Sequence, residues 1–308
     1  PKPSSAASDV YKRQTLVDFA IWYAGAVTVP VYETSSVSQV SWIIEDSHVR
    51  AVVTGNENLA KTVRDAVQRE GLPELIGLWT MDPADGAPGS GLEALVALGT
   101  DVTDEELETR RSSAGLADLA TIIYTSGTTG RPKGCELTHE NFAELVNQTL
   151  SSSLGDVVRQ DTSTVLFIPL AHVFARFVSV LTVAAGARCG HVSDIKRLSV
   201  SLQTFQPSFV LAVPRVFEKI YNAALLNAQS GGKEKIFRRG ADVAIRWSRA
   251  LDSGQMTAPL RLQRAFYSAL IYRRIRTAMG GRLAYAVSGG GPLSPDLAHF
   301  FRGVGVTI

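Results

Sequence analysis

The sequence predicts an α/β fold in which parallel β-sheets are flanked by helices. Short runs rich in β-branched residues recur along the chain, and longer amphipathic patterns separate most of them. Strands that alternate with helices favour parallel sheets covered by helices. Hydrophobic residues make up 45% of the 308 residues and charged residues 19%, a composition that supports a large buried core and excludes a disordered chain.

The predicted elements follow one another from Leu16, where a clear apolar pattern begins. We predict strands at the short apolar runs 27–31, 50–54, 74–79, 120–124, 164–168, 187–192, 208–213 and 282–287. Helical periodicity is found at residues 39–46, 58–69, 138–150, 173–184 and 216–226. Residues 231–280 depart from the alternation, because they carry two long helical patterns with no strand between them.

The first fourteen residues, PKPSSAASDVYKRQ, have the composition of a tail and not of a packed element. We therefore expect residues 1–14 to be a non-native or disordered tail. Residues 15–308 are expected to form the folded part of the chain.

Basic residues are concentrated in one region, although the formal charge of +2 for the whole chain gives no argument for nucleic-acid binding. Residues 211–282 hold fourteen Lys and Arg but four Asp and Glu, an excess of ten. Helical periodicity places Leu262, Phe266, Ala269 and Leu270 on one face, with the arginines elsewhere. Such helices can contact an acidic membrane surface or the phosphates of a ligand. Solvated helix faces with cations near the helix ends are the simpler interpretation.

The two cysteines, Cys135 and Cys189, are too few for a disulfide framework and lack the spacing of a metal site. They favour a reducing, cytosolic compartment. The most apolar long stretch, residues 165–187, has His172 and Arg176 in its interior. It therefore indicates a buried strand and helix and not a membrane span.

The strongest functional signal is the segment YTSGTTGRPKG at residues 124–134. Three glycines in eleven residues allow backbone N–H groups to turn inward around an anion. The alternative, a plain surface turn, needs only two or three Ser, Thr or Gly residues and not eleven residues in this order with a lysine. The P-loop pattern G-x-x-x-x-G-K-[ST] does not fit, because Gly127 and Gly130 are too close and a glycine follows the lysine. The lysine supplies the positive charge that a polyphosphate needs. The candidate phosphate ligands are Thr125, Ser126, Gly127, Thr128, Thr129, Gly130 and Lys133.

A second glycine cluster, SGGGP, follows the predicted strand 282–287 and precedes a helix that starts near Pro295. Glycines after a strand let a flat ring approach the backbone closely. The cluster is a poor dinucleotide fingerprint, because Ser294 occupies the third glycine position, and a plain tight turn is the alternative interpretation. The candidate binding residues are Ser288, Gly289, Gly290, Gly291 and Pro292.

One of the five histidines, His172, lies in the segment IPLAHVFAR at residues 168–176. A single histidine in apolar surroundings is more often a core or capping residue than a catalytic one. The residue type alone therefore leaves both interpretations open.

These segments together resemble the adenylate-forming superfamily, which contains acyl-CoA synthetases, peptide-synthetase adenylation domains and luciferases. The resemblance implies that residues 125–130 and Lys133 hold the β- and γ-phosphates of ATP and that Thr125 helps to ligate Mg²⁺. It implies that residues 288–292 form the adenine-binding turn and that His172 lies at the carboxylate pocket. Lys133 and His172 are thus the implied catalytic residues.

Two further strings, VPRVFEKIY at residues 213–221 and GAVTVPVYETS at residues 25–35, resemble the long-chain fatty-acyl branch. The implied enzyme is a long-chain-fatty-acid–CoA ligase that uses ATP, Mg²⁺ and CoA. A fatty-acid carboxylate attacks the α-phosphate to give acyl-AMP and pyrophosphate, and the CoA thiol then displaces AMP. We expect a cytoplasmic protein that binds no nucleic acid, with peripheral contact to the inner face of a membrane as a further expectation.

The resemblance extends over residues 16–308 and over about half of a complete family member. We expect a partial AMP-binding domain at residues 15–308, truncated at both ends, without the Tyr-Gly-x-Thr-Glu motif and the C-terminal catalytic Lys of the family. Such a chain is expected to have no turnover by itself. An adenylating enzyme for an amino or aryl acid, a non-catalytic nucleotide- or acyl-binding module, and a structural or membrane-associated domain are the alternatives.

Overall fold

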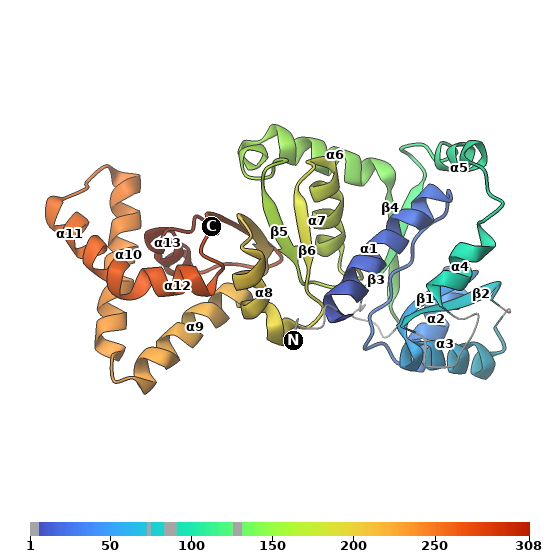
Figure 1. The fold of residues 1–308 in the computed structure, drawn as a ribbon, viewed down its shortest axis with the longest axis horizontal. Helices are drawn as coiled ribbons and strands as arrows, with labels where there is room; N and C mark the ends of the chain where they lie inside the picture. Colours follow the sequence, from blue (N-terminus) through green and yellow to red (C-terminus); the bar gives the residue numbers. More distant parts are fainter. Residues whose placement is uncertain (1–5, 73–74, 83–90, 126–130) are drawn as a thin grey trace. The chain divides into compact units, whose positions relative to one another are not determined.

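The computed structural model describes residues 6–72, 75–82, 91–125 and 131–308 (Figure 1). The chain divides into two units. The first unit comprises Pro1–Thr149 and Ile168–Val180, and the second comprises Leu150–Phe167 and Leu181–Ile308. Each unit is described by itself.

In the first unit, strands β1 (Ala51–Asn56) and β2 (Gly77–Asp82) pair in parallel, and helix α3 (Glu57–Glu70) connects them (Figure 1). The helix begins where the side chain of Asn56 accepts a hydrogen bond from the N–H of Leu59. It ends at a glycine in the left-handed conformation. The predicted strand at residues 50–54 is confirmed as β1. The strand predicted at residues 74–79 is β2, which begins three residues later than predicted, at Gly77.

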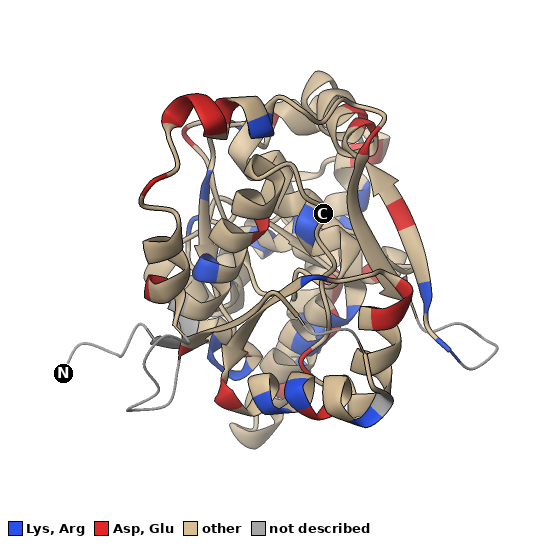
Figure 2. Ribbon diagram, turned by 90° about the vertical axis from the view of Figure 1, so that its right-hand side faces the viewer, with Lys and Arg blue, Asp and Glu red and all other residues tan. Residues whose placement is uncertain are grey.

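One hydrophobic cluster of the first unit lies between α3 and helix α2 (Val37–Asp46). Val40 and Ile44 of α2 pack with Val63 and Ala66 of α3. The remaining helices of this unit are α1 (Ala6–Tyr23), α4 (Leu92–Leu98), α5 (Asp104–Arg111) and α6 (His139–Ser151), together with the first part of α7 (Val173–Ala184). Figure 2 shows acidic and basic residues interspersed over the helices nearest the viewer.

The residues predicted as a tail contain the first turns of a helix. Residues 1–5 lie outside the described residues, but α1 begins at Ala6, and Arg13 forms an ion pair with Asp82 at the end of β2. Residues 6–14 are therefore helical and not disordered, while the non-native origin of residues 1–14 stays a prediction. The apolar residues of α1 show little helical periodicity, which is why the sequence pattern did not reveal the helix.

Strands β3 (Leu119–Thr125) and β4 (Lys133–Thr138) pair antiparallel, which the prediction of parallel sheets did not include. The sequence KGCELT of β4 carries no apolar alternation, because most of its side chains are exposed. Residues 27–31, predicted as a strand, contribute only a single parallel bridge between Thr28 and Thr121. Pro30 lacks an N–H group and cannot donate to a sheet ladder.

In the second unit all strand pairs are parallel, as predicted: β5 (Ser163–Leu166) with β6 (Arg188–His191), and β7 (Phe209–Ala212) with β8 (Tyr285–Ser288). The N–H of Ser208 donates to the carbonyl of Ser163 at 2.9 Å and links the two pairs. All residues of β5 and β7 are buried, as is typical of strands in a covered parallel sheet.

The helices of the second unit include α8 (Leu198–Phe205), α9 (Pro214–Ser230) and α13 (Pro295–Val304), with short helical turns at Ser153–Asp156 and Ile195–Arg197. The predicted long helices of residues 231–280 are α10 (Glu234–Ser253) and a second helix in three parts. These parts are α11 (Ala258–Tyr267), a π-helical turn (Ser268–Tyr272) and α12 (Arg273–Ala278). Among the described residues, no helix combines the length and the apolar character needed to cross a bilayer.

Candidate functional site

The hairpin of β3 and β4 brings together the two ends of the segment YTSGTTGRPKG. Thr125, the last residue of β3, lies directly opposite Lys133, the first residue of β4. Opposed residues in an antiparallel pair present their side chains on the same face, so the side chains of Thr125 and Lys133 leave the same face of the hairpin at the mouth of this segment. The residues between them that were predicted as phosphate ligands, Ser126, Gly127, Thr128, Thr129 and Gly130, lie outside the described residues.

Helix α2 holds both ends of the same segment through side chains that the sequence analysis missed. The hydroxyl of Tyr124 donates to the carboxylate of Asp46 at 2.5 Å. The indole N–H of Trp42 donates to the carbonyl of Pro132 at 2.9 Å, and the guanidinium of Arg131 lies 4.6 Å from the centre of the Trp42 ring. Residues 42 and 46 are one helical turn apart and share a face of α2, which is the only sequence signal that links them.

The hydroxyl group of Tyr124 is stabilised in its protonated form. Burial and, second, the hydrogen bond to the carboxylate of Asp46 raise the pKa of Tyr124 to about 12. The phenol therefore stays neutral at physiological pH, and it remains a hydrogen-bond donor that fixes the end of β3 against α2.

A pocket of about 450 Å³ opens beside the hairpin. Thr125 at the end of β3 and His172 at the start of α7 both line it, so the structure places these two predicted site residues at one cavity within the first unit. The complete lining is Pro30, Val31, Tyr32, Ser35, Gln39, Ile43, Ile123, Tyr124, Thr125, Pro132, Ala171, His172 and Val173. This mixture of apolar walls and a few polar groups is typical of small-molecule sites.

His172 both caps α7 and faces the pocket. Its Nδ1 accepts a hydrogen bond from the N–H of Phe174 at 3.4 Å, so it acts as a capping residue, the alternative that the sequence left open. With Nδ1 as acceptor, the neutral ring carries its proton on Nε2. The side chain is exposed at the pocket, where the Nε2–H group can donate to an acidic ligand.

One turn further along α7, Arg176 is buried with only 1% of its surface exposed. Its guanidinium donates to the carboxylate of Asp18 in α1 and to the hydroxyl of Thr28, both at 2.6 Å. Thr28 in turn is bonded to β3, because its carbonyl accepts from the N–H of Ile122 and from the hydroxyl of Thr121. Burial raises the pKa of Asp18 and lowers that of Arg176, and the attraction between the two groups opposes both shifts. This network joins the two elements that carry Thr125 and His172.

The second glycine cluster lies in the second unit, at the carboxyl ends of β7 and β8, where ligands bind in open parallel sheets. The N–H of Gly289 donates to the carbonyl of Ala212 at 3.3 Å. Gly290 has a φ of 78°, which disfavours any residue with a side chain. The hydroxyl of Ser288 is buried and has no hydrogen-bond partner among the described residues. A buried polar group without a partner fits a site for a polar ligand, whereas a plain tight turn gives no reason for it.

The described residues include no group of three or more His, Cys, Asp or Glu side chains arranged to hold a metal ion. The hydroxyl of Thr125 can supply one oxygen ligand. Mg²⁺ usually takes few protein ligands and completes its coordination with substrate phosphates and water. The hydroxyl of Thr125 therefore fits the role of one ligand among several for a Mg²⁺ ion that arrives with a nucleotide.

Comparison with known proteins gives a consistent result over nearly the whole chain. The family model described as "AMP-binding enzyme" matches residues 12–308. Long-chain-fatty-acid–CoA ligase FadD15 of Mycobacterium tuberculosis is 42% identical over 293 residues, which cover 95% of this chain and 48% of that protein. Long-chain-fatty-acid–CoA ligase 1 of Homo sapiens is 29% identical over 291 residues, or 90% of this chain and 39% of the human protein. The chain thus spans half or less of the length of these relatives.

Solved structures share the fold at low sequence identity. A long-chain-fatty-acid-CoA ligase, FadD1 of Archaeoglobus fulgidus, matches 95% of this chain and 46% of its own with a TM-score of 0.61 and 18% identity. The A-PCP didomain of a carboxylic acid reductase from Segniliparus rugosus, in complex with AMP, matches over 95% of this chain and 39% of its own length. Its TM-score is 0.65 and its sequence identity is 20%. These likenesses confirm the predicted α/β class.

Proposed function

This chain belongs to the AMP-binding enzyme family, and we propose that it forms the ATP- and acid-binding part of a long-chain-fatty-acid–CoA ligase. The 42% identity to FadD15 supports the long-chain fatty acid as substrate. Because the chain spans 48% of that relative, the complete reaction is proposed for a protein of the relatives' length. In this reaction a fatty acid and ATP give acyl-AMP and pyrophosphate, and CoA then takes the acyl group.

The observation that carries this proposal is the position of Thr125 opposite Lys133 at the mouth of the glycine-rich segment. The ammonium group of Lys133 would balance the negative charge that grows on pyrophosphate as it leaves. Groups held in place before the reaction stabilise such charge most effectively, and the contacts of Tyr124 with Asp46 and of Pro132 with Trp42 hold both ends of the segment against α2. When bound with ATP, Mg²⁺ would reduce the repulsion between the phosphates, and Thr125 would contribute one oxygen ligand.

His172 is proposed to orient the substrate carboxylate. His172 and Thr125 line the same pocket, so a carboxylate bound there could accept a hydrogen bond from the Nε2–H group. Holding the carboxylate in one orientation favours its attack on a neighbouring phosphate. The apolar residues of the same pocket, such as Val31, Ile43 and Val173, can contact the first carbons of an acyl chain.

The turn at residues 288–292 is proposed to bind the adenine ring. Its glycines expose the backbone, and the unpartnered hydroxyl of Ser288 can bond to a ring nitrogen or to the exocyclic amino group. This proposal predicts that Ser288→Ala weakens binding of AMP without reducing stability, because the hydroxyl has no partner to lose among the described residues.

A comparison of acid substrates tests the proposed function. A chain extended to the length of its relatives would be assayed for pyrophosphate release with palmitate, benzoate and aspartate. We expect the highest kcat/KM with palmitate. Release with benzoate or aspartate alone would favour an adenylating enzyme for another acid, and silence with all three acids, in a folded protein that binds ATP, would favour a non-catalytic module. We propose a cytoplasmic location for this reaction.

A further inference from the structure

Three large apolar side chains lie exposed along the second helix of residues 231–280. Leu262 and Phe266 of α11 are 73% and 63% exposed, and Leu270 of the following π-helical turn is 41% exposed. They recur every four residues, so they follow one side of the helix. Exposed apolar side chains that are scattered singly need no explanation, but a contiguous row marks an interaction site.

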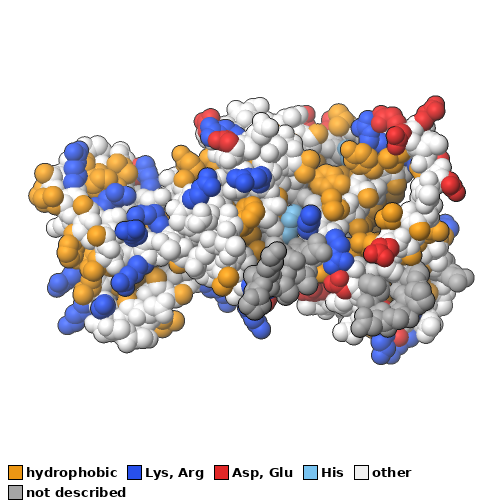
Figure 3. All heavy atoms as spheres, in the orientation of Figure 1, with side chains coloured by type: hydrophobic (Ala, Val, Ile, Leu, Met, Phe, Trp, Pro, Cys, Tyr) orange, Lys and Arg blue, Asp and Glu red, His pale blue; other side chains and the backbone are white. Residues whose placement is uncertain are grey.

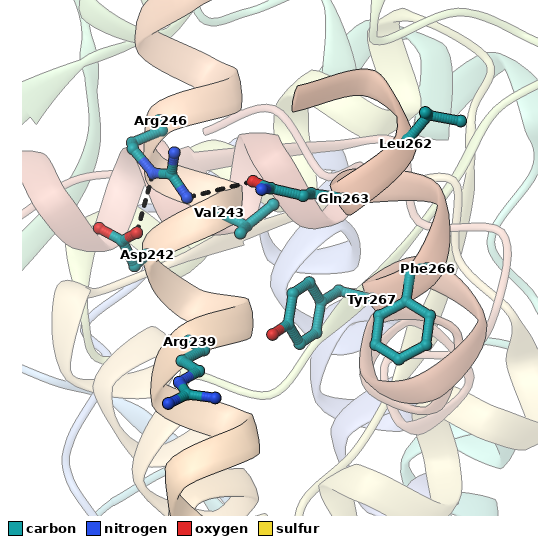
Figure 4. A pocket seen from close by; sticks show the side chains of 8 residues that line it. All are labelled: Arg239, Asp242, Val243, Arg246, Leu262, Gln263, Phe266 and Tyr267. Carbon is teal, nitrogen blue, oxygen red and sulfur yellow. Dashed lines mark hydrogen bonds and ion pairs between the residues drawn. The ribbon is translucent and has the colours of Figure 1, made fainter. Parts of the chain in front are cut away.

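A groove of about 430 Å³ lies between this row and helix α10. Figure 4 shows Arg239, Asp242 and Arg246 along α10, facing Gln263 and Tyr267 of α11 across the groove, while Leu262 and Phe266 lie farther from α10. The guanidinium of Arg246 donates to the carboxylate of Asp242 at 2.8 Å and to the side-chain oxygen of Gln263 at 3.3 Å. The α10 wall of the groove therefore carries a net positive charge, from two arginines and one aspartate, and the α11 wall is mainly apolar.

The positive charge of this region is only partly balanced. The acids Glu234 and Asp242 pair with Arg238 and Arg246 on the same helix. Arg239, Arg273 and Arg274 are exposed, and the ion pairs of the described residues give none of them an acidic partner. Figure 3 shows basic and hydrophobic side chains interspersed over α10 and α11, at the left of the view.

We propose that this surface docks on an anionic lipid bilayer. The docking surface is defined as Leu262, Phe266 and Leu270 with Arg239, Arg273 and Arg274. Apolar side chains enter the boundary between headgroups and acyl chains, while arginines pair with lipid phosphates, which is how amphipathic helices bind an interface. The proposal does not depend on the ligase reaction, because it uses no residue of the nucleotide or acid site.

Charge favours a bilayer over a second copy of the chain. In a two-fold contact the same surface faces itself, so Arg239, Arg273 and Arg274 of both copies would be brought together, and like charges disfavour such contacts. A nucleic acid would satisfy the arginines but would leave the row of three apolar side chains without a partner. An anionic bilayer satisfies both kinds of group.

Co-sedimentation with lipid vesicles tests the proposal. The 308-residue chain would be mixed with vesicles of phosphatidylcholine alone or of phosphatidylcholine with phosphatidylglycerol. The apolar variant is Leu262→Ser with Phe266→Ser. Its matched control is Val96→Ser with Leu98→Ser in α4, because these residues are 74% and 73% exposed and lie in the first unit. The charge variant is Arg273→Gln with Arg274→Gln, and its control is Arg50→Gln with Lys61→Gln, which are exposed as well.

We expect the unsubstituted chain to bind the anionic vesicles and to bind the neutral ones much more weakly. Both docking-surface variants should lose affinity for the anionic vesicles by about tenfold or more. Each basic residue and each inserted apolar side chain contributes to the free energy of binding to the bilayer. The two controls should bind as the parent does, and added salt should weaken binding. Circular dichroism checks that all variants fold, which is expected because every substituted side chain is exposed.

Three outcomes would overturn the proposal. The first is equal binding by the parent and the docking-surface variants. The second is a dimer in size-exclusion chromatography that the Leu262→Ser/Phe266→Ser variant abolishes, which would assign the surface to self-association. The third is loss of vesicle binding in a chain extended to the relatives' length, which would show that other residues of the protein cover the surface. Loss of ligase activity in that longer chain has no bearing on any of these results.

Discussion

The carboxylate of Asp18 and the guanidinium of Arg176 form a buried ion pair at 2.6 Å, between residues 158 positions apart in the sequence. Through Thr28 the same guanidinium is connected to β3, and Arg176 lies one turn after His172 on α7. The ion pair therefore fixes the start of α7 relative to the end of β3, and these are the elements that line the candidate pocket.

Substitution of Asp18 by Asn should destabilise the protein strongly. Removing one partner of a buried pair leaves the other charge without compensation, which typically costs about 3 kcal/mol or more in free energy of unfolding. Urea denaturation measures this loss. As a control, Glu106→Ala breaks the exposed pair of Glu106 with Arg110 and should change stability by less than about 1 kcal/mol.

A double-mutant cycle separates pairing from packing. If Asp18→Asn and Arg176→Met each remove the same interaction, the double variant should lose much less than the sum of the two single variants. Additive losses would show that the two side chains contribute independently, and the proposed role of the pair in fixing α7 would then be wrong.

The phenol of Tyr124 should make stability depend on pH in the alkaline range. Its pKa is raised from 10.0 to about 12 in the folded protein, so the folded state holds this proton more tightly than the unfolded state does. The stabilisation is complete below pH 10 and is lost as the pH rises toward 12. The stability difference between the parent and Tyr124→Phe should therefore shrink over that range, as measured by denaturation at a series of pH values. A constant difference would contradict the contact with Asp46.

The two cysteines should differ in reactivity. Cys135 is exposed, whereas burial raises the pKa of Cys189 to about 11. Since the thiolate is the reactive species, a chromogenic thiol reagent at neutral pH should label Cys135 rapidly and Cys189 only slowly. The variants Cys135→Ser and Cys189→Ser assign the two rates, and rapid labelling of the Cys135→Ser variant would disagree with the half-buried position and raised pKa of Cys189.

The glycine at position 290 should matter for nucleotide binding beyond its backbone conformation. Gly290 and Gly281 have the same φ of 78°, so Gly290→Ala and Gly281→Ala should each lose about 1 kcal/mol of stability. Only Gly290→Ala lies in the proposed adenine turn and should weaken binding of AMP, as measured by calorimetry. Similar AMP affinities for the two variants would count against the adenine turn.

Local sequence signals predicted the parts of the site that depend on neighbouring residues. The strand before the glycine-rich segment is β3, and the helix that Thr138 was expected to begin is α6, where the hydroxyl of Thr138 accepts from the N–H of Asn141 at 3.3 Å. The second glycine cluster follows β8, as predicted. In each case the signal and the structure lie within a few residues of each other.

The parts that the sequence did not predict depend on distant or exposed contacts. Strand β4 is exposed and carries no apolar alternation, so its pairing with β3 left no pattern. The contacts of Arg176 with Asp18 and of Trp42 with Pro132 join residues 158 and 90 positions apart, and no local rule links them. The row of Leu262, Phe266 and Leu270 was expected on one helical face, but only the structure shows that this face is exposed.

The measurement that tests the central claim most directly is palmitate-dependent release of pyrophosphate from ATP by a chain extended to the length of its relatives. Lys133→Ala should lower kcat by about 100-fold or more, as expected when a preorganised charge at a reacting phosphate is removed. Lys61→Ala, in α3 and away from the pocket residues, should leave the rate unchanged, and the 308-residue chain alone should show no release. Equal rates for Lys133→Ala and Lys61→Ala would contradict the assignment of residues 124–134 as the phosphate-binding segment.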